Sequence, residues 1–190
     1  MKIQNLFLAT LITITSLNAI AQDTNQADHT LSIEIPEIAL LDIESKDGNN
    51  ISLTATAPTE AGDKVIFEQT NSDLWINYSS IVGSKETRQV TVQITDGNVP
   101  DGIELTVMAT NDAGSGEGTM GKAAKAPIVL NDKKATNIID GVGSAYTGNG
   151  ASKGHNLTYK IAQSDDKDSY SKLNFDQSTS ITITYTLTDI

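Results

Sequence analysis

The sequence predicts an all-β protein, an antiparallel two-sheet sandwich of eight to nine strands that follows a cleaved signal peptide. Three observations lead to this fold class. Segment after segment alternates apolar and polar residues with a period of two, as half-buried strands do. Clusters of Gly, Asn, Asp and Pro separate these segments. Beyond the first 21 residues, no stretch of useful length has the helical period of 3.6.

The N-terminus has the pattern of an export signal. Lys2 supplies a positive start, residues 6–17 form an apolar run, and Ala19 and Ala21 give the small-residue cleavage pattern. The run is shorter than the roughly 20 apolar residues of a membrane-spanning helix, so we expect cleavage. The predicted parts are a signal peptide over 1–21, a polar leader over 22–29 and one β domain over 30–190. The mature chain would then be exported to the periplasm, the cell surface or the extracellular space, without direct membrane insertion.

The first strand is predicted at the edge of the sheet. Leu31, Ile33 and Ile35 alternate with polar residues, and the pattern resumes after Pro36 as far as residue 43. Proline cannot donate to a ladder, so the strand should be broken there and lie at an edge. Because an open edge can pair with another chain, Leu31, Ile33 and Ile35 are the predicted interaction residues. Folding back onto the chain's own domain is favoured because it avoids the entropy cost of association, and donation to a neighbour is the alternative.

Eight further segments alternate or form short apolar runs between turn signals, and we expect a strand in each: 51–57, 65–68, 74–82, 90–94, 103–107, 128–130, 157–161 and 181–187. Small residues over 111–126 predict a loop, and the glycine-rich stretch over 137–154 predicts irregular backbone. Trp75 is expected in the core, because its large apolar area is best buried there. Tyr78, three residues further on, should then face the opposite way.

Composition restricts the partners. Without Lys2 the mature chain has 12 basic and 24 acidic residues, a balance that repels nucleic-acid phosphates and anionic lipids. Nucleic acid is therefore not expected as a partner. The chain has no cysteine, which removes disulfides, thiolate chemistry and cysteine-based metal sites, even though an exported protein could form disulfides.

Two glycine patterns match known catalytic spacings without their context. The glycines between Gly116 and Gly121 have dinucleotide-loop spacing, but Pro127 leaves no room for the helix that must follow. Ser152 has nucleophile-elbow spacing, but the only downstream histidine, His155, is too close to arrive from a separate loop. We therefore expect neither a cofactor nor a catalytic set, so an enzyme is not predicted. A hydrolase hidden in the glycine-rich loops is the last alternative.

An acidic loop is the one weak candidate for a metal site. Asp165, Asp166 and Asp168 could supply hard oxygen ligands to Ca²⁺. The spacing fails the helix-loop-helix calcium pattern, because Ser171 stands where that pattern requires glycine. A solvated acidic loop is the favoured interpretation, and no metal site is predicted.

Two parts of the chain, residues 29–44 and the C-terminal part from 154 to 188, carry a family resemblance. HTLSIEIPEIALLDIE at 29–44, together with GHNLTY at 154–159 and ITITYTLT at 181–188, resembles small secreted β-sandwich proteins of Bacteroidetes bacteria. More distantly, the layout is similar to pilin subunits of the chaperone-usher and spore-coat-U type. The resemblance implies an Ig-like or pilin-like sandwich that acts by association. The chain departs from those pilins in lacking a disulfide and in ending Asp189-Ile190, without a penultimate tyrosine.

The leading functional prediction is a secreted structural or adhesive surface protein. Its partner would be another copy or another surface protein, bound through the N-terminal strand that carries Leu31, Ile33 and Ile35. The alternative from a different class is an extracellular binding module for a glycan or Ca²⁺.

Overall fold

The computed structural model describes residues 25–130, 134–177 and 179–190. The predicted signal peptide, residues 1–21, lies outside the described residues. The chain divides into two units, Met1–Glu34 and Ile35–Ile190. Every strand and the one short helix of the described chain belong to the second unit.

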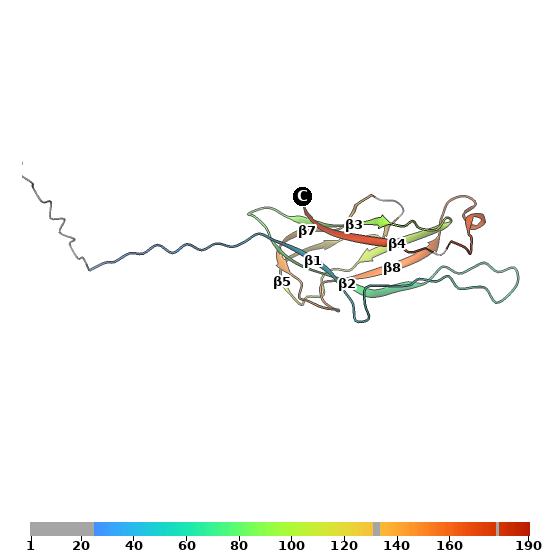
Figure 1. Cartoon of the computed structure of the whole chain (residues 1–190), viewed down its shortest axis with the longest axis horizontal. Coiled ribbons are helices and arrows are strands. Elements are labelled where there is room, and N and C mark those ends of the chain that lie inside the picture. Colours follow the sequence, from blue (N-terminus) through green and yellow to red (C-terminus); the bar gives the residue numbers. More distant parts are fainter. Residues whose placement is uncertain (1–24, 131–133, 178) are drawn as a thin grey trace, which may run out of the picture. The chain divides into compact units, whose positions relative to one another are not determined.

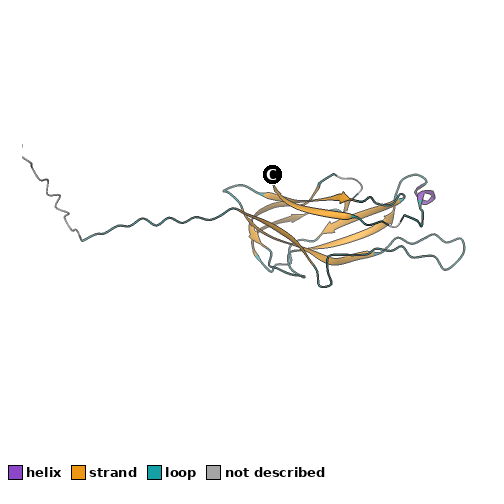
Figure 2. Cartoon of the chain, in the orientation of Figure 1, coloured by secondary structure: helices purple, strands orange, loops and turns teal. Residues whose placement is uncertain are grey.

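The second unit is all-β, as the alternation predicts (Figure 2). Its helix is a single 3₁₀ turn, η1 (Ser169–Lys172), and the described residues include no α-helix. The strands, labelled in Figure 1 where there is room, are β1 (Ile38–Glu44), β2 (Thr70–Ile81), β3 (Arg88–Asp96), β4 (Ile103–Ala109), β5 (Glu117–Ala123), β6 (Ile128–Val129), β7 (Thr136–Tyr146), β8 (His155–Gln163) and β9 (Thr182–Asp189).

All strand pairs are antiparallel and form one hydrogen-bonded network in the order β6-β4-β8-β2-β7-β3-β9. β1 adds to β2, and β5 adds to β7. β2 changes partner along its length. Residues from Thr70 to Ile76 pair with β8, whereas Ser79 and Ser80 pair with the end of β7. β2 is therefore the strand through which the two groups of strands are connected.

Alternation places one row of each central strand in the core. On β2 the buried apolar residues are Leu74, Ile76 and Tyr78, and β3 contributes a row of the same kind. Burying such aliphatic side chains stabilises the fold by about 1.5–3 kcal/mol each. The remaining core residues come from β3, β4, β7 and β8 and from around β6: Val90, Val92, Ile94, Leu105, Val107, Ala109, Ile128, Leu130, Ile138, Ile139, Val142, Ala145, Leu157 and Tyr159.

Trp75 does not lie in the core, and this prediction is wrong. It is half-buried, and its neighbours Leu74 and Ile76 are the buried residues. Successive residues of a strand face opposite sides, so burying Leu74 and Ile76 turns the indole to the other face. The core aromatic of this strand is Tyr78.

Two segments predicted as loops are paired strands. The small-residue stretch contains β5, and the glycine-rich stretch contains β7, which pairs with β5, β3 and β2. The backbone of Gly118 on β5 lies so close to β7 that an added Cβ would be 2.2 Å from the Ser144 carbonyl oxygen. Glycine therefore permits this pairing instead of preventing it.

Two segments predicted as strands carry almost no ladder. Residues 51–57 and 65–68 form only an isolated bridge between Thr56 and Ile66. The predicted first strand begins at Ile38, after Pro36, and residues 31–35 lie outside every strand. Alternation shows that a segment can be half-buried, but it does not supply the partner strand that a ladder needs.

Candidate interaction site

The predicted interaction residues are open to solvent. Leu31, Ile33 and Ile35 are 74 %, 81 % and 74 % exposed. Folding back onto the chain's own domain, the arrangement favoured on the sequence, would bury these side chains. Large aliphatic side chains that recur at every second residue and stay exposed form an apolar row without a cover.

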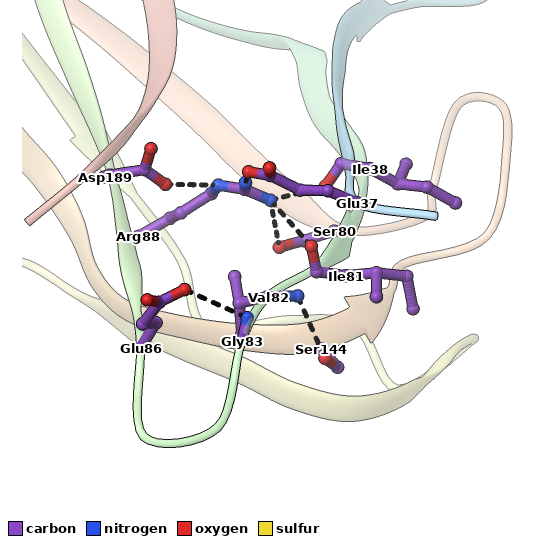
Figure 3. Close-up of polar contacts among 10 residues, drawn as sticks. All are labelled: Glu37, Ile38, Ser80, Ile81, Val82, Gly83, Glu86, Arg88, Ser144 and Asp189. Atoms are coloured by element: carbon purple, nitrogen blue, oxygen red, sulfur yellow. Dashed lines mark hydrogen bonds and ion pairs between the residues drawn. The ribbon is translucent and has the colours of Figure 1, made fainter. Parts of the chain in front are cut away.

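A buried arginine holds the first residues of β1 beside the end of β9 (Figure 3). The Arg88 side chain at the start of β3 is only 3 % exposed. Its Nε donates to Asp189 Oδ1 on β9 at 2.8 Å, and Nη2 donates to Glu37 Oε1. Nη1 donates to the carbonyl oxygen of Ile38, the first residue of β1. A buried charge needs such partners, and here two carboxylates and a carbonyl supply them.

The end of β2 and the turn that leads to β3 complete this cluster. Arg88 Nη1 also donates to Ser80 Oγ at 3.2 Å and to the Ile81 carbonyl oxygen at 3.3 Å. The Gly83 amide donates to Glu86 Oε2 at 3.1 Å across the turn. Four strands, β1, β2, β3 and β9, therefore meet around one guanidinium, whose planar fork of donors suits several acceptors at once.

β1 and β9 are edge strands that lie near each other. Among the described residues β1 pairs only with β2, and β9 pairs only with β3. Their inward-facing apolar side chains are half-buried, in contrast to the fully buried rows of β2 and β3. The side chains concerned are Leu41 and Ile43 on β1, and Ile183, Tyr185 and Leu187 on β9. The open edges of β1 and β9 therefore border a region of the core that is only half-buried.

A buried polar cluster lies where β2, β5 and β8 meet. His155 is fully buried, its Nδ1 lies 2.8 Å from the Thr110 carbonyl oxygen, and its Nε2 lies 2.9 Å from the Tyr78 hydroxyl. The same hydroxyl donates to the Met120 carbonyl oxygen. Burial lowers the pKa of His155 and raises the pKa of Tyr78, and the negative charge of Asp112 acts on both. With both ring nitrogens engaged and no exposure, this histidine belongs to the packing of the core.

The structure shows where the residues of the two glycine patterns with catalytic spacing lie. Ser152 is exposed in the β7–β8 turn with a left-handed backbone, φ 67°. The next histidine, His155, faces the interior. Gly116 and Gly118 lie against β7, where added Cβ atoms would overlap the backbone.

The acidic loop is open and contains one weak ion pair. Asp165, Asp166 and Asp168 are exposed, and Asp166 Oδ2 lies 3.7 Å from Lys172 Nζ. Asp168 precedes η1 with a left-handed backbone, φ 62°. In the described part of the chain, no group of three or more His, Asp or Glu side chains is placed to hold a metal ion.

Sequence reasoning did not anticipate Arg88 and His155. Both come from polar positions in strands, where exposure is the usual outcome. One signal was available for Arg88, because it occupies the inward row that continues through Val90 and Val92. A charged residue in register with a buried row indicates a buried ion pair.

Comparison with protein-family models, with curated proteins and with solved structures gives no match. Within the described ranges, no helix has the length and apolarity needed to cross a membrane.

Proposed function

We propose that this chain is a secreted structural or adhesive surface protein that assembles by donating its N-terminal segment to another copy. The observation that carries the proposal is the exposed apolar row of Leu31, Ile33 and Ile35. Covering three such side chains favours association by the hydrophobic effect. The export pattern of residues 1–21 and the acidic composition agree with an extracellular place of action.

The strand pairing supports a two-sheet sandwich of Ig-like or pilin-like type as the finer fold. β1, β2, β8, β4 and β6 would form one sheet, and β5, β7, β3 and β9 the other. The pairing of Ser79 and Ser80 with β7 would then be the place where the two sheets join. In this arrangement β1 and β9 are the neighbouring edges of opposite sheets.

The open edges of β1 and β9 are the proposed acceptor. Residues 30–35, if extended, span about 20 Å at about 3.3 Å per residue, which suits the eight residues of β9. Their backbone would pair with an open edge, and Leu31, Ile33 and Ile35 would cover the half-buried row of Tyr185 and Leu187. The alternating polar residues, Ser32 and Glu34, would stay in water.

The test compares the mature chain, residues 22–190, with a variant that carries Leu31→Asp, Ile33→Asp and Ile35→Asp. We expect the mature chain to form oligomers or fibres that grow with protein concentration, because a donated strand links each copy to the next. The variant should be monomeric and should melt at the temperature of the dilute, unassembled mature chain, because Leu31, Ile33 and Ile35 are exposed in the single chain. Sedimentation velocity and electron microscopy measure the two outcomes.

A matched control changes the other face of the same segment, Ser32→Ala with Glu34→Gln, and should associate like the unmodified chain. A synthetic peptide of residues 30–37 should compete for the acceptor and shorten the assemblies. A mature chain that stays monomeric at all concentrations, or a triple variant that associates as before, contradicts the proposal.

A further inference from the structure

A recess on the outward face of the sheet surrounds the one tryptophan of the sequence. Trp75 lies in the middle of β2, opposite Glu44 of β1 and Asn156 of β8. Ser72 and Asp73, at the start of the same strand, line the recess with it. The floor is therefore a half-buried indole between polar side chains, on the face that the core does not use.

The first wall is the turn that follows β1, which contributes Lys46 and Asp47. The Ser45 hydroxyl donates to the Gly48 carbonyl oxygen at 2.6 Å and accepts from the Asp47 amide at 3.2 Å. These bonds close the turn on itself. The carboxylate of Asp47 is thus carried by a turn of defined shape.

The second wall is the β7–β8 turn, which contributes Ala151 and Ser152. Buried Asn77 holds it through both atoms of its amide, with Nδ2 donating to the Lys153 carbonyl oxygen at 2.9 Å and Oδ1 accepting from the Gly150 amide at 2.6 Å. Both walls are therefore fixed by hydrogen bonds, so the recess is formed before anything binds, as ligand sites usually are.

We propose that this recess binds one sugar ring of a neutral glycan. The apolar face of a pyranose can stack on the Trp75 indole, which is the largest apolar surface in the recess. Its hydroxyls can then donate to the carboxylates of Asp47 and Asp73 and exchange hydrogen bonds with Ser152.

Size and charge narrow the ligand class. The cavity measures about 170 Å³, below the roughly 300–1,000 Å³ of sites for drug-sized molecules, so a single ring fits better than an enclosed oligosaccharide. The recess carries two carboxylates, Asp47 and Asp73, against one cation, Lys46, and the net charge of the chain is −11. This balance disfavours uronic acids and sialic acids. The site is independent of the association proposed above, because none of its residues belongs to the N-terminal segment.

Because Trp75 is the only tryptophan, its fluorescence reports on this recess alone. The mature chain is titrated with methyl β-glucopyranoside, methyl β-galactopyranoside and N-acetylglucosamine, and with glucuronic acid as the charged comparison. We expect at least one neutral sugar to shift the indole emission in a saturable way. Glucuronic acid should bind at least about tenfold more weakly, because it adds a carboxylate beside two others.

Sugar binding by variants, measured by calorimetry, distinguishes specific binding in this recess from non-specific binding elsewhere. Trp75→Ala should abolish binding, and Asp47→Asn, on an exposed turn, should weaken it about tenfold by removing a charged acceptor. Phe175→Ala, which removes a 96 % exposed aromatic elsewhere, is the matched control and should bind normally. The triple variant at residues 31, 33 and 35 should also bind normally even if association is lost. The inference is overturned if no neutral sugar alters the emission, or if Asp47→Asn binds as tightly as the unmodified chain.

Discussion

At the scale of single residues, the hydrogen bonds of His155 define its protonation. Nδ1 must carry a hydrogen, because its partner, the Thr110 carbonyl oxygen, can only accept. In the neutral imidazole Nε2 is an acceptor, so it shares the single hydrogen of the Tyr78 hydroxyl with the Met120 carbonyl oxygen. Desolvation is the largest influence on His155 and lowers its pKa below the ordinary value of 6.5. The imidazole is therefore held neutral in the folded chain.

This burial makes the folded state sensitive to mild acid. The unfolded chain binds a proton at the ordinary pKa of 6.5, whereas the folded chain binds it only at lower pH. Between those two values the unfolded state carries more protons, so the free energy of unfolding should fall as pH drops through 6.5. We expect a slope of at most about 1.4 kcal/mol per pH unit from this residue in urea unfolding.

Two variants assign that slope to its source. His155→Gln should flatten the slope between about pH 7 and pH 5.5, whatever its effect on overall stability. His29→Gln replaces the other, exposed histidine and should leave the slope unchanged. An equal slope in His155→Gln and the unmodified chain would show that other groups cause it.

At the scale of strands, the pairing of β5 with β7 depends on glycine at close approach. Gly118 has φ +104°, and its backbone lies against Ser144 and Ala145. The register of the ladder shifts between Gly118 and Met120, which marks a bulge. A glycine at a bulge supplies a backbone that side-chain-bearing residues adopt only with strain.

The change Gly118→Ala should therefore destabilise the chain by more than the backbone angle alone explains. Gly62 has a similar angle, φ +99°, but nothing lies within 4 Å of an added Cβ there, so Gly62→Ala is the matched control. We expect Gly118→Ala to lower the free energy of unfolding by at least about 2 kcal/mol more than Gly62→Ala. Urea unfolding measures both variants. An equal loss of unfolding free energy in Gly118→Ala and Gly62→Ala would contradict the prediction, because it would mean that β5 can move away from β7 at little cost.

Alternation and short apolar runs were enough to locate seven strands, β1, β2, β3, β4, β6, β8 and β9, because each turns apolar side chains toward the core. It could not locate β5, whose side chains are small and whose pairing comes from close backbone approach. The face of β2 was misassigned because a single bulky residue, Trp75, competed with a row of three smaller ones. Summed over Leu74, Ile76 and Tyr78, that row buries more area.

The candidate site was predictable only in part. Leu31, Ile33 and Ile35 stand out by spacing alone, but their exposure depends on whether a partner edge is free, which is a property of the finished fold. The recess around Trp75 joins residues from the turn after β1, from β2 and from the β7–β8 turn. Nothing in local spacing indicates that these segments meet.

At the scale of the whole molecule, Arg88 joins parts of the chain that are far apart in sequence. It binds Glu37 and Ile38 at the start of the β unit and Asp189 at its end (Figure 3). The two carboxylates reach into water, with 72 % and 77 % exposure, while the guanidinium is buried. The two carboxylates are therefore solvated, whereas the guanidinium that binds them is shielded from water.

Removing Arg88 should loosen both ends of the unit together. Arg88→Met leaves the carbonyl oxygens of Ile38 and Ile81 without this donor, so we expect a loss of about 3 kcal/mol in the free energy of unfolding. Amide hydrogen exchange should speed up in β1 and β9 more than in β4 or β8. The matched control is Lys172→Ala, which removes an exposed pair with Asp166 and should change stability by less than about 1 kcal/mol. Unchanged exchange in β1 and β9 would show that Arg88 does not hold the ends.

The Arg88 contact also determines how folding depends on the redox state of the surroundings. A disulfide joining ends this far apart in sequence would be worth about 4–5 kcal/mol, but it would need an oxidant to form and a reductant could open it. With no cysteine in the sequence, the ends meet through an ionic contact that involves no electron transfer. The unit Ile35–Ile190 can therefore fold to the same state in oxidising and reducing media.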